Sequence, residues 1–423
     1  MALTPPPTWA TDANYDAGSD AWSGLPTKRA PSVGEQAKGK IPGQFFFAQV
    51  MNYLLNLYSA VMQVFVNHTE DSAAQFGLVA TDEYTTVLAD SINVRAASLA
   101  LANWTLLTPN FGGATAKSIA YIEVGSAGGP VRLVVGCTSG AVYTSDDYGS
   151  TWTSRTSNTT KSINAWAYDS SQNVLVGVCA DAEIITTTDG ITYTARASGA
   201  AGTPDLLDVC WSSGHGLFIA VGEVDPTNAY VGTSPTGATW TKRTFSVTGS
   251  NANLVSVAAS DNVTSRVVAV SATRAFLSTN GTSFAAGVDI SGIQDHERVV
   301  FLDNHDSQFL ILGTDGTNSR SASSPDGITW NVGSNFGVGS TVTAGLVAVP
   351  FAILGSSLPG ACAFTTQGPT WRCLEAGAAT VEWKQIGYRP GSFAGFSSVA
   401  GGRVFAPSGA ANQLYATLHL GAV

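Results

Sequence analysis

Acidic side chains are the first groups in this sequence to consider for chemistry. Hydrolysis of a glycosidic bond needs two carboxyl groups roughly 5 to 9.5 Å apart. The available candidates are Glu123, Asp205, Asp208, Glu223, Asp225, Asp295, Glu297, Asp303 and Asp306. Their spacing along the chain does not pair any two of them, so we predict no catalytic residue.

The densest polar stretch surrounds a short apolar run at 299–302. Asp295, His296 and Glu297 precede the run, and His305 follows it. Histidines and carboxylates are common metal ligands, but a strand between the two groups would keep them apart. The chain also lacks a G-x-x-x-x-G-K-[ST] phosphate loop and a useful G-x-S-x-G nucleophile motif. We therefore expect no metal, no cofactor and no enzymatic activity.

The composition excludes several classes of partner. Charged residues make up only 12% of the 423 residues, about half the usual share. The 20 Lys and Arg against 30 Asp and Glu give a net charge of −10 with no basic cluster. We therefore expect no nucleic-acid partner, and an anionic membrane surface would repel the chain. Three cysteines lie in apolar runs, which predicts small buried side chains at Cys137, Cys179 and Cys210.

The first 96 residues predict an arm, a helix and a connector. Residues 1–43 carry prolines and glycines without any regular periodicity, so we expect an extended arm that becomes ordered against a partner. Residues 44–70 predict one long α-helix, and residues 71–96 are a mixed connector. The chain does not start with a basic segment and an apolar core, so we expect no secretion signal.

The predicted helix has one apolar seam. Its side chains step alternately by three and four positions, as in a coiled coil: Phe47, Val50, Leu54, Leu57, Val61 and Val64. Such a face needs a partner, which is either the β domain of the same chain or further copies of the helix, with a homotrimer favoured. Polar residues interrupt the uncharged stretch 41–67 every few positions, so we expect no membrane span.

Internal repetition defines the rest of the chain. Residues 145–152 match the pattern S-x-D-x-G-x-T-W, which we call the box. Weaker copies follow, and their closing aromatic residues lie at positions 193, 240, 284, 330 and 371. The residues that define the copies are Ser145, Asp147, Gly149, Trp152, Asp189, Gly190, Gly237, Trp240, Gly281, Asp326, Gly327, Trp330, Gly368 and Trp371. A period of about 44 residues is that of one four-stranded blade of a β-propeller.

Apolar runs precede the boxes and predict strands covered on both faces. They lie at 133–136, 175–178, 218–221, 267–270, 309–312 and 351–354. A seventh pair of strands is predicted at 383–388 and 393–397. The fold class is therefore all-β, a propeller of about seven blades over residues 97–423. Either the strand at Trp104 or the run 414–418 supplies the outer strand of the last blade.

Each box has a mechanical explanation. Ser and Asp side chains bond turn amides, Gly supplies a positive φ, and the aromatic residue plugs between strands of its blade. We therefore interpret the box as a hairpin brace on the rim of the propeller, with a structural role for Asp147, Asp189 and Asp326.

These boxes resemble those of the Asp-box propellers, a group that includes sialidases and other glycan-processing or glycan-binding proteins. The resemblance covers residues 118–375 closely and 376–418 loosely. It implies the propeller fold and says little about activity.

A second resemblance concerns the N-terminal part. Trp9-Ala-Thr-Asp-Ala-Asn14, the turn Pro42-Gly43 and the stretch 48–56 are similar to the arm-plus-helix opening of tailed-bacteriophage tail fibre and tail appendage proteins. In that family the first region docks on the virion and the distal domain faces outward. The resemblance implies a location in the virion tail and other tail proteins as partners.

The sialidase comparison also makes a prediction about arginines. Sialidases use three arginines from different blades to hold a carboxylate. Arg155, Arg196 and Arg243 each follow a box aromatic by three residues, so we expect them on outer strands, facing away from a shared site. The Arg-Ile-Pro motif is missing, and seven predicted blades differ from the six of sialidases. We therefore do not expect sialidase activity.

Together these observations predict a non-enzymatic structural protein of a phage tail. Its N-terminus would dock on the virion, and its propeller would bind host-surface glycan or a virion protein. The alternative is a glycan hydrolase, resembling tailspike enzymes, with its site at the mouth of the propeller channel.

Overall fold

The computed structural model describes residues 104–125, 129–260, 265–302, 308–333, 343–348, 361–365, 369–376, 381–388, 398–400, 403–407 and 410–417. They belong to one compact unit, Asp90–Val423. The predicted arm 1–43, helix 44–70 and connector 71–96 lie outside the described residues. The predicted seam from Phe47 to Val64 and the box residue Gly368 lie outside them as well.

The described strands pair into seven four-stranded antiparallel sheets. The first holds β2 (Ala116–Glu123), β3 (Val131–Cys137), β4 (Val142–Ser145) and β5 (Thr153–Arg155). The second holds β6 (Ile163–Asp169), β7 (Val174–Cys179), β8 (Glu183–Thr187) and β9 (Thr194–Ala197). The third holds β10 (Leu206–Ser212), β11 (Leu217–Val224), β12 (Ala229–Ser234) and β13 (Thr241–Lys242).

The remaining sheets repeat this order. The fourth holds β14 (Leu254–Ser260), β15 (Arg266–Ser271), β16 (Arg274–Ser278) and β17 (Val288–Asp289). The fifth holds β18 (Asp295–Leu302), β19 (Gln308–Thr314), β20 (Ser319–Ser324) and β21 (Asn331–Val332). The sixth holds β22 (Thr343–Ala348), β23 (Ala361–Thr365), β24 (Pro369–Ala376) and β25 (Val381–Tyr388). The seventh holds β26 (Ser398–Ala400), β27 (Arg403–Pro407), β28 (Leu414–Thr417) and β1 (Trp104–Leu107).

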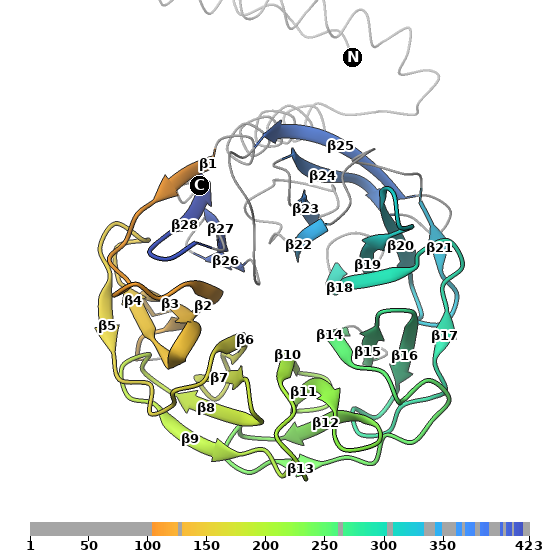
Figure 1. Cartoon of the computed structure of the whole chain (residues 1–423), viewed down its shortest axis with the longest axis horizontal. Helices are drawn as coiled ribbons and strands as arrows, with labels where there is room; N and C mark the ends of the chain where they lie inside the picture. Colours follow the sequence, from red (N-terminus) through yellow and green to blue (C-terminus); the bar gives the residue numbers. More distant parts are fainter. Residues whose placement is uncertain are drawn as a thin grey trace, which may run out of the picture. The chain divides into compact units, whose positions relative to one another are not determined.

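The sheets form a closed ring. Each innermost strand contacts the innermost strand of the next sheet, and β26 contacts β2 (Figure 1). The predicted all-β propeller is therefore confirmed. The ring closes through β1, which pairs antiparallel with β28 from Trp104 opposite Thr417 to Leu107 opposite Leu414. Of the two alternatives for the last sheet, Trp104 supplies the outer strand, and residues 414–417 supply the strand beside it.

The core lies between neighbouring sheets. In the first five sheets, the second strand is buried along most of its length, and in β19 every residue is buried. These strands match the apolar runs predicted at 133–136, 175–178, 218–221, 267–270 and 309–312. Such runs fit because sheets cover both faces of each strand. The described helix is a short 3-10 turn, η1 (Thr138–Gly140). Within the described ranges, no helix has the length and apolarity needed to span a bilayer.

The sixth sheet differs from the prediction. The stretch 383–388, predicted to open a seventh blade, belongs to β25, the outermost strand of the sixth sheet. The sixth box copy joins β23 to β24, the second and third strands, and Trp371 lies within β24 opposite Ala363. β24, the strand that follows the sixth box copy, spans eight residues. In the first sheet the strand that follows the box is the outermost strand β5, which spans three. An open edge of that length favours pairing with a further strand. The predicted strand at 393–397 lies outside the described residues.

Candidate functional site

The sheet topology gives the ring two different faces. Successive connections of an antiparallel meander emerge on alternate faces. The turns between third and fourth strands carry the first five boxes, and we call their side the box face. The opposite side carries the second-to-third connections and the connections between sheets, and we call it the linker face.

The polar side chains of the first five boxes form hydrogen bonds within their own turns. In the first box, the Gly149 amide donates to Ser145 Oγ at 2.8 Å, and the Thr151 amide donates to Asp147 Oδ1 at 2.8 Å. Trp152 Nε1 donates to the Gly149 carbonyl at 3.1 Å. Asp189 accepts two amides at 2.8 Å in the second box, as does Asp326 in the fifth. Each carboxylate thus replaces backbone partners that the turn cannot provide.

The boxes also join neighbouring sheets. Tyr193 of the second sheet packs in one cluster with Val134 and Val142 of the first, and Trp240 of the third sheet packs with Val176 of the second. Each cluster also contains residues of the aromatic's own sheet, such as Ile185 beside Tyr193 and Phe218 beside Trp240, so the aromatic packs in a core shared by two sheets. A Cβ atom on Gly237 would lie 2.7 Å from Val176 Cγ2, so the turn itself rests on the preceding sheet.

Polar contacts reinforce these joints. Arg132 Nη1 of the first sheet donates to the Asp189 carbonyl at 2.5 Å. Gln172 Nε2 of the second donates to the Pro235 carbonyl at 2.8 Å. Arg266 of the fourth sheet donates likewise to the Asp326 carbonyl. A side chain from one sheet therefore holds the box backbone of the next.

The fourth box provides a direct test of the carboxylate. Asn280 stands where Asp189 and Asp326 stand, and its Oδ1 accepts the amides of Thr282 and Ser283 at 2.9 and 2.8 Å. Hydrogen bonds to a charged acceptor are about twice as strong as neutral ones. Asn280→Asp should therefore raise the free energy of unfolding by about 1 kcal/mol at neutral pH, measured by chemical denaturation.

The pKa of Asp326, which occupies the equivalent position in the fifth box, provides a low-pH control for Asn280→Asp. Burial disfavours its charge, but the amides of Thr329 and Ile328, the Ser324 hydroxyl and the charge of Arg266 together outweigh burial and hold the pKa of Asp326 below its usual value. Such a carboxylate stabilises the fold above its unfolded pKa, and this contribution is lost as pH falls through the folded pKa. The advantage of Asn280→Asp should disappear in acid. An equal gain at about pH 2.5 would contradict a role for the charge.

The three repeated arginines lie where the sequence predicted. Arg155 Nε donates to Thr144 at 2.9 Å, Arg196 Nε to Thr186 at 3.0 Å, and Arg243 Nε to Thr233 at 2.7 Å. Each bond joins a fourth strand, or the residue after it, to the third strand of the same sheet. The three guanidinium groups therefore do not converge on one site.

Two of the acidic candidates, Asp205 and Glu223, are in contact, and Asp225 has a basic partner. Asp225 forms an ion pair with Lys242 at 2.7 Å and accepts the amides of Ala201 and Gly202. The Asp205 amide donates to Glu223 Oε2 at 3.1 Å. Asp303 and Asp306 lie outside the described residues. No group of three His, Cys, Asp or Glu suited to a metal occurs within the described part of the chain.

Asp208 belongs to a polar row across three innermost strands. Its Oδ2 accepts Ser256 Oγ at 2.7 Å and the Val257 amide at 3.0 Å. Ser256 Oγ in turn accepts the Val299 amide of β18 at 3.2 Å. Burial raises the pKa of Asp208, although the positive charge of Arg298 opposes that rise. The row joins the third, fourth and fifth sheets.

Innermost strands share a β-bulge near their first residue. The pairing register shifts there in the first six sheets, which leaves Lys117, Asn164, Leu207, Val255, Glu297 and Ala344 as the extra residues. Burial, with a smaller contribution from the charge of Asp295, raises the pKa of Glu297 to about 7. Glu297 is thus an unusual carboxyl group on the wall of the ring. Glu297 is one of the acidic candidates in the sequence, but no sequence pattern indicates the bulge on which it lies.

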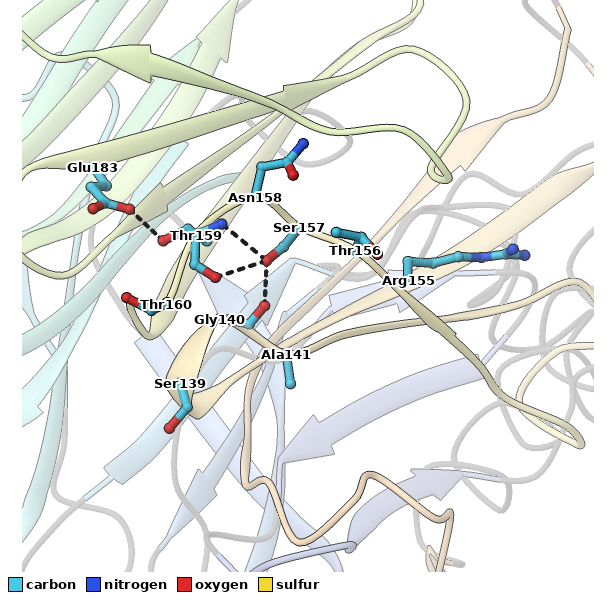
Figure 2. A pocket seen from close by; sticks show the side chains of 10 residues that line it. All are labelled: Ser139, Gly140, Ala141, Arg155, Thr156, Ser157, Asn158, Thr159, Thr160 and Glu183. Atoms are coloured by element: carbon cyan, nitrogen blue, oxygen red, sulfur yellow. Dashed lines mark hydrogen bonds between the residues drawn. The ribbon is translucent and has the colours of Figure 1, made fainter.

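A hollow of about 480 Å³ lies on the linker face between the first and second sheets (Figure 2). It is lined by Ser139, Gly140, Ala141, Arg155, Thr156, Ser157, Asn158, Thr159, Thr160 and Glu183. These residues come from the η1 connection, from the end of β5 and its link to β6, and from the start of β8. Figure 2 shows Glu183 at one side of the hollow and Arg155 at the other, with hydroxyl side chains between them.

Hydrogen bonds fix the walls of this hollow. Ser157 Oγ donates to the Gly140 carbonyl at 2.5 Å, and the Thr159 hydroxyl donates to Glu183. Asn158 Nδ2 donates to the Tyr193 carbonyl at 2.6 Å. Ser139 and Asn158 adopt φ values of 55° and 61°, a conformation that non-glycine residues rarely take. Such strained residues persist where their surroundings hold them and cluster at functional sites. Sequence reasoning missed this hollow.

Cys137, Cys179 and Cys210 are the cysteines whose side chains the structure describes. Cys137 and Cys179 are buried thiols, and Cys210 is half-buried. Burial raises the pKa of Cys137 to about 12. The prediction of small buried side chains is confirmed for the first two.

Comparison with known proteins relies on structure alone. No protein-family model matches the chain, and no curated protein matches its sequence. A solved structure of YCF48 bound to D1 peptide shares 15% identity at a TM-score of 0.52, covering 74% of this chain and 95% of that chain. Virginiamycin B lyase from Staphylococcus aureus shares 9% identity at a TM-score of 0.55, covering 74% and 99%. The chain has a β-propeller fold.

A third neighbour widens the range of functions. The WD40 β-propeller domain of Doa1 shares 13% identity at a TM-score of 0.53, covering 74% of this chain and 96% of that domain. The neighbours thus include a lyase as well as proteins whose names carry no enzymatic activity. Identities this low show the fold alone, so no specific activity follows from them.

Proposed function

We propose that this protein is a structural component of a phage virion tail, a seven-bladed Asp-box propeller that binds host-surface glycan. One observation supports binding most directly: the two faces of the ring differ. The box face uses its turns as joints between sheets, whereas the linker face carries a fixed polar hollow. Hydroxyl, amide and carboxylate groups held in place are what recognises sugar hydroxyls.

The N-terminal residues support the location in the virion. Their arm-plus-helix pattern resembles tail fibre and appendage proteins, in which that region docks on the particle. In this proposal, residues 1–43 dock, residues 44–70 assemble copies of the chain, and the propeller faces the host. Other tail proteins are the partners at the docking end.

A glycan array tests the binding function. The full chain should bind bacterial surface glycans on the array, and a chain ending at residue 97 should bind none of them. Absence of binding by the full chain to every glycan would remove host-surface glycan as the partner.

The predicted seam is tested by mass in solution. Light scattering should give a trimer for the full chain and a monomer for a chain that begins at Ser98, because the seam would be lost. Leu54→Asp and Val61→Asp place charges on that apolar seam and should also give monomers. Unchanged masses in both comparisons would show that the helix does not assemble copies of the chain.

A second candidate function has one observation in its favour. A general acid in glycoside hydrolysis needs a carboxyl group that is protonated near neutral pH, and burial raises the pKa of Glu297 to about 7. A hydrolase would therefore use Glu297 on the innermost strand β18. Release of reducing sugar from glycans that the array identifies, abolished by Glu297→Gln, would support this alternative.

A further inference from the structure

We infer that the hollow between the first and second sheets binds an uncharged saccharide unit of one or two rings. This inference rests on the proposed function and names its ligand class. It follows from the size of the hollow, the fixed positions of its walls and the hydroxyl and charged groups that line it.

The volume suits a small ligand. At about 480 Å³, the hollow lies near the lower end of the range of roughly 300 to 1,000 Å³ for small-molecule sites. A phosphate ion would leave most of it empty. A long polymer would engage it with one or two units only, as the terminal or branching sugar of a surface glycan would.

The wall groups match hydroxyl partners. Ser139, Thr156 and Thr160 are exposed hydroxyl residues on the rim, and each hydroxyl can both donate and accept. The buried Ser157 and half-buried Thr159 use their hydroxyls to fix the loop, to the Gly140 carbonyl and to Glu183 respectively. The loop therefore loses little conformational entropy when a ligand binds.

Charged residues of both signs line the hollow. Arg155 and Glu183 contribute one positive and one negative charge to its lining, at separate sides in Figure 2. Arg155 uses its Nε on Thr144, which orients the guanidinium group, and an arginine has further N–H donors on its Nη atoms. Glu183 accepts one hydroxyl through Oε2, and a carboxylate has several acceptor positions. A ligand with both hydrogen-bond donors and acceptors is complementary to this pair.

The sequence repeat supplies a matched control. Arg155 and Arg196 occupy equivalent positions and make the same bond, to Thr144 and Thr186 respectively. Only Arg155 lines the hollow. Arg155→Met and Arg196→Met therefore remove the same charge and the same hydrogen bond, and they differ in contact with the ligand.

The experiment is saturation-transfer NMR on the full chain. The probes are the methyl glycosides of glucose, galactose, mannose, rhamnose and N-acetylglucosamine, with glucuronic acid and glucosamine as charged comparisons. At least one neutral glycoside should bind, and Arg196→Met should leave its affinity unchanged. Arg155→Met and Glu183→Gln should each weaken it by about tenfold or more, as expected for loss of a hydrogen bond to a charged group.

A variant that fills the hollow tests the site without loss of folding. Thr156→Trp places a large ring in the hollow at an exposed residue, and should abolish binding while the thermal transition stays unchanged. Equal effects of Arg155→Met and Arg196→Met, a preference for the charged sugars, or unchanged binding by Thr156→Trp would overturn the inference.

Failure of this inference is distinguishable from failure of the proposed function. If the array shows glycan binding that Arg155→Met and Thr156→Trp retain, the propeller binds glycan elsewhere and the hollow is not the site. If the full chain binds no glycan at all, both proposals fall.

Discussion

Replacing Gly237 by alanine is expected to lower the free energy of unfolding by about 2 to 5 kcal/mol. Two effects add. Gly237 has a φ of +73°, which costs an alanine roughly 1 to 2 kcal/mol. The new methyl group would also lie 2.7 Å from Val176 Cγ2 of the preceding sheet, and overpacking of this kind costs about 1 to 3 kcal/mol. Chemical denaturation followed by tryptophan fluorescence measures the loss.

A second glycine separates the two effects. Gly216 has a φ of +61°, but a Cβ atom there would meet nothing within 4 Å. Gly216→Ala should therefore lose only the conformational part, about 1 to 2 kcal/mol. If both alanine variants lost the same stability, the box turn would not be a joint between sheets.

The stability of the propeller should fall as pH rises from about 4.5 to about 7, through a contribution from Glu297. Burial raises the pKa of Glu297 from 4.5 to about 7 in the folded chain. Within that window the folded chain keeps a proton that the unfolded chain releases, so each rise in pH favours unfolding. Above pH 7 this titration lowers the free energy of unfolding by about 3 kcal/mol, at about 1.4 kcal/mol for each pKa unit.

Glu297→Gln isolates this effect, because glutamine has a similar shape and no titration. The variant and the parent chain should have similar stabilities at about pH 4. At about pH 8 the variant should be more stable, by up to about 3 kcal/mol. Comparison of the two chains at each pH cancels the titration of all other groups. A constant difference across the range would mean that Glu297 ionises as it does in the unfolded chain.

The sequence predicted those parts of the fold that depend on local pattern. Runs such as Leu133–Gly136 and Phe309–Leu312 indicate strands covered on both faces, and the structure places them in β3 and β19. The equivalent positions of Arg155, Arg196 and Arg243 also followed from the repeat. In these cases the pattern of residues close together in the chain is enough to predict the structure.

The features that the sequence did not predict depend on pairing between distant segments. The assignment of residues 381–388 to the sixth sheet follows from the open edge of β24. The bulge at Glu297 is visible only against its partner strand β19. The hollow brings together residues 139–141, 155–160 and Glu183, which in sequence resemble any solvated loop. Polar loop residues carry no periodicity that reveals their partners.

Ring closure by β1 has a mechanical consequence. The chain enters the described ring at Trp104, and β1 joins the seventh sheet through its pairing with β28. A force applied through the N-terminal side of the chain therefore acts first on this pair of four-residue strands. In a protein tethered by its N-terminus, the pairing of β1 with β28 would therefore set the strength of the tether. The other six sheets would bear load only after β1 had separated from β28.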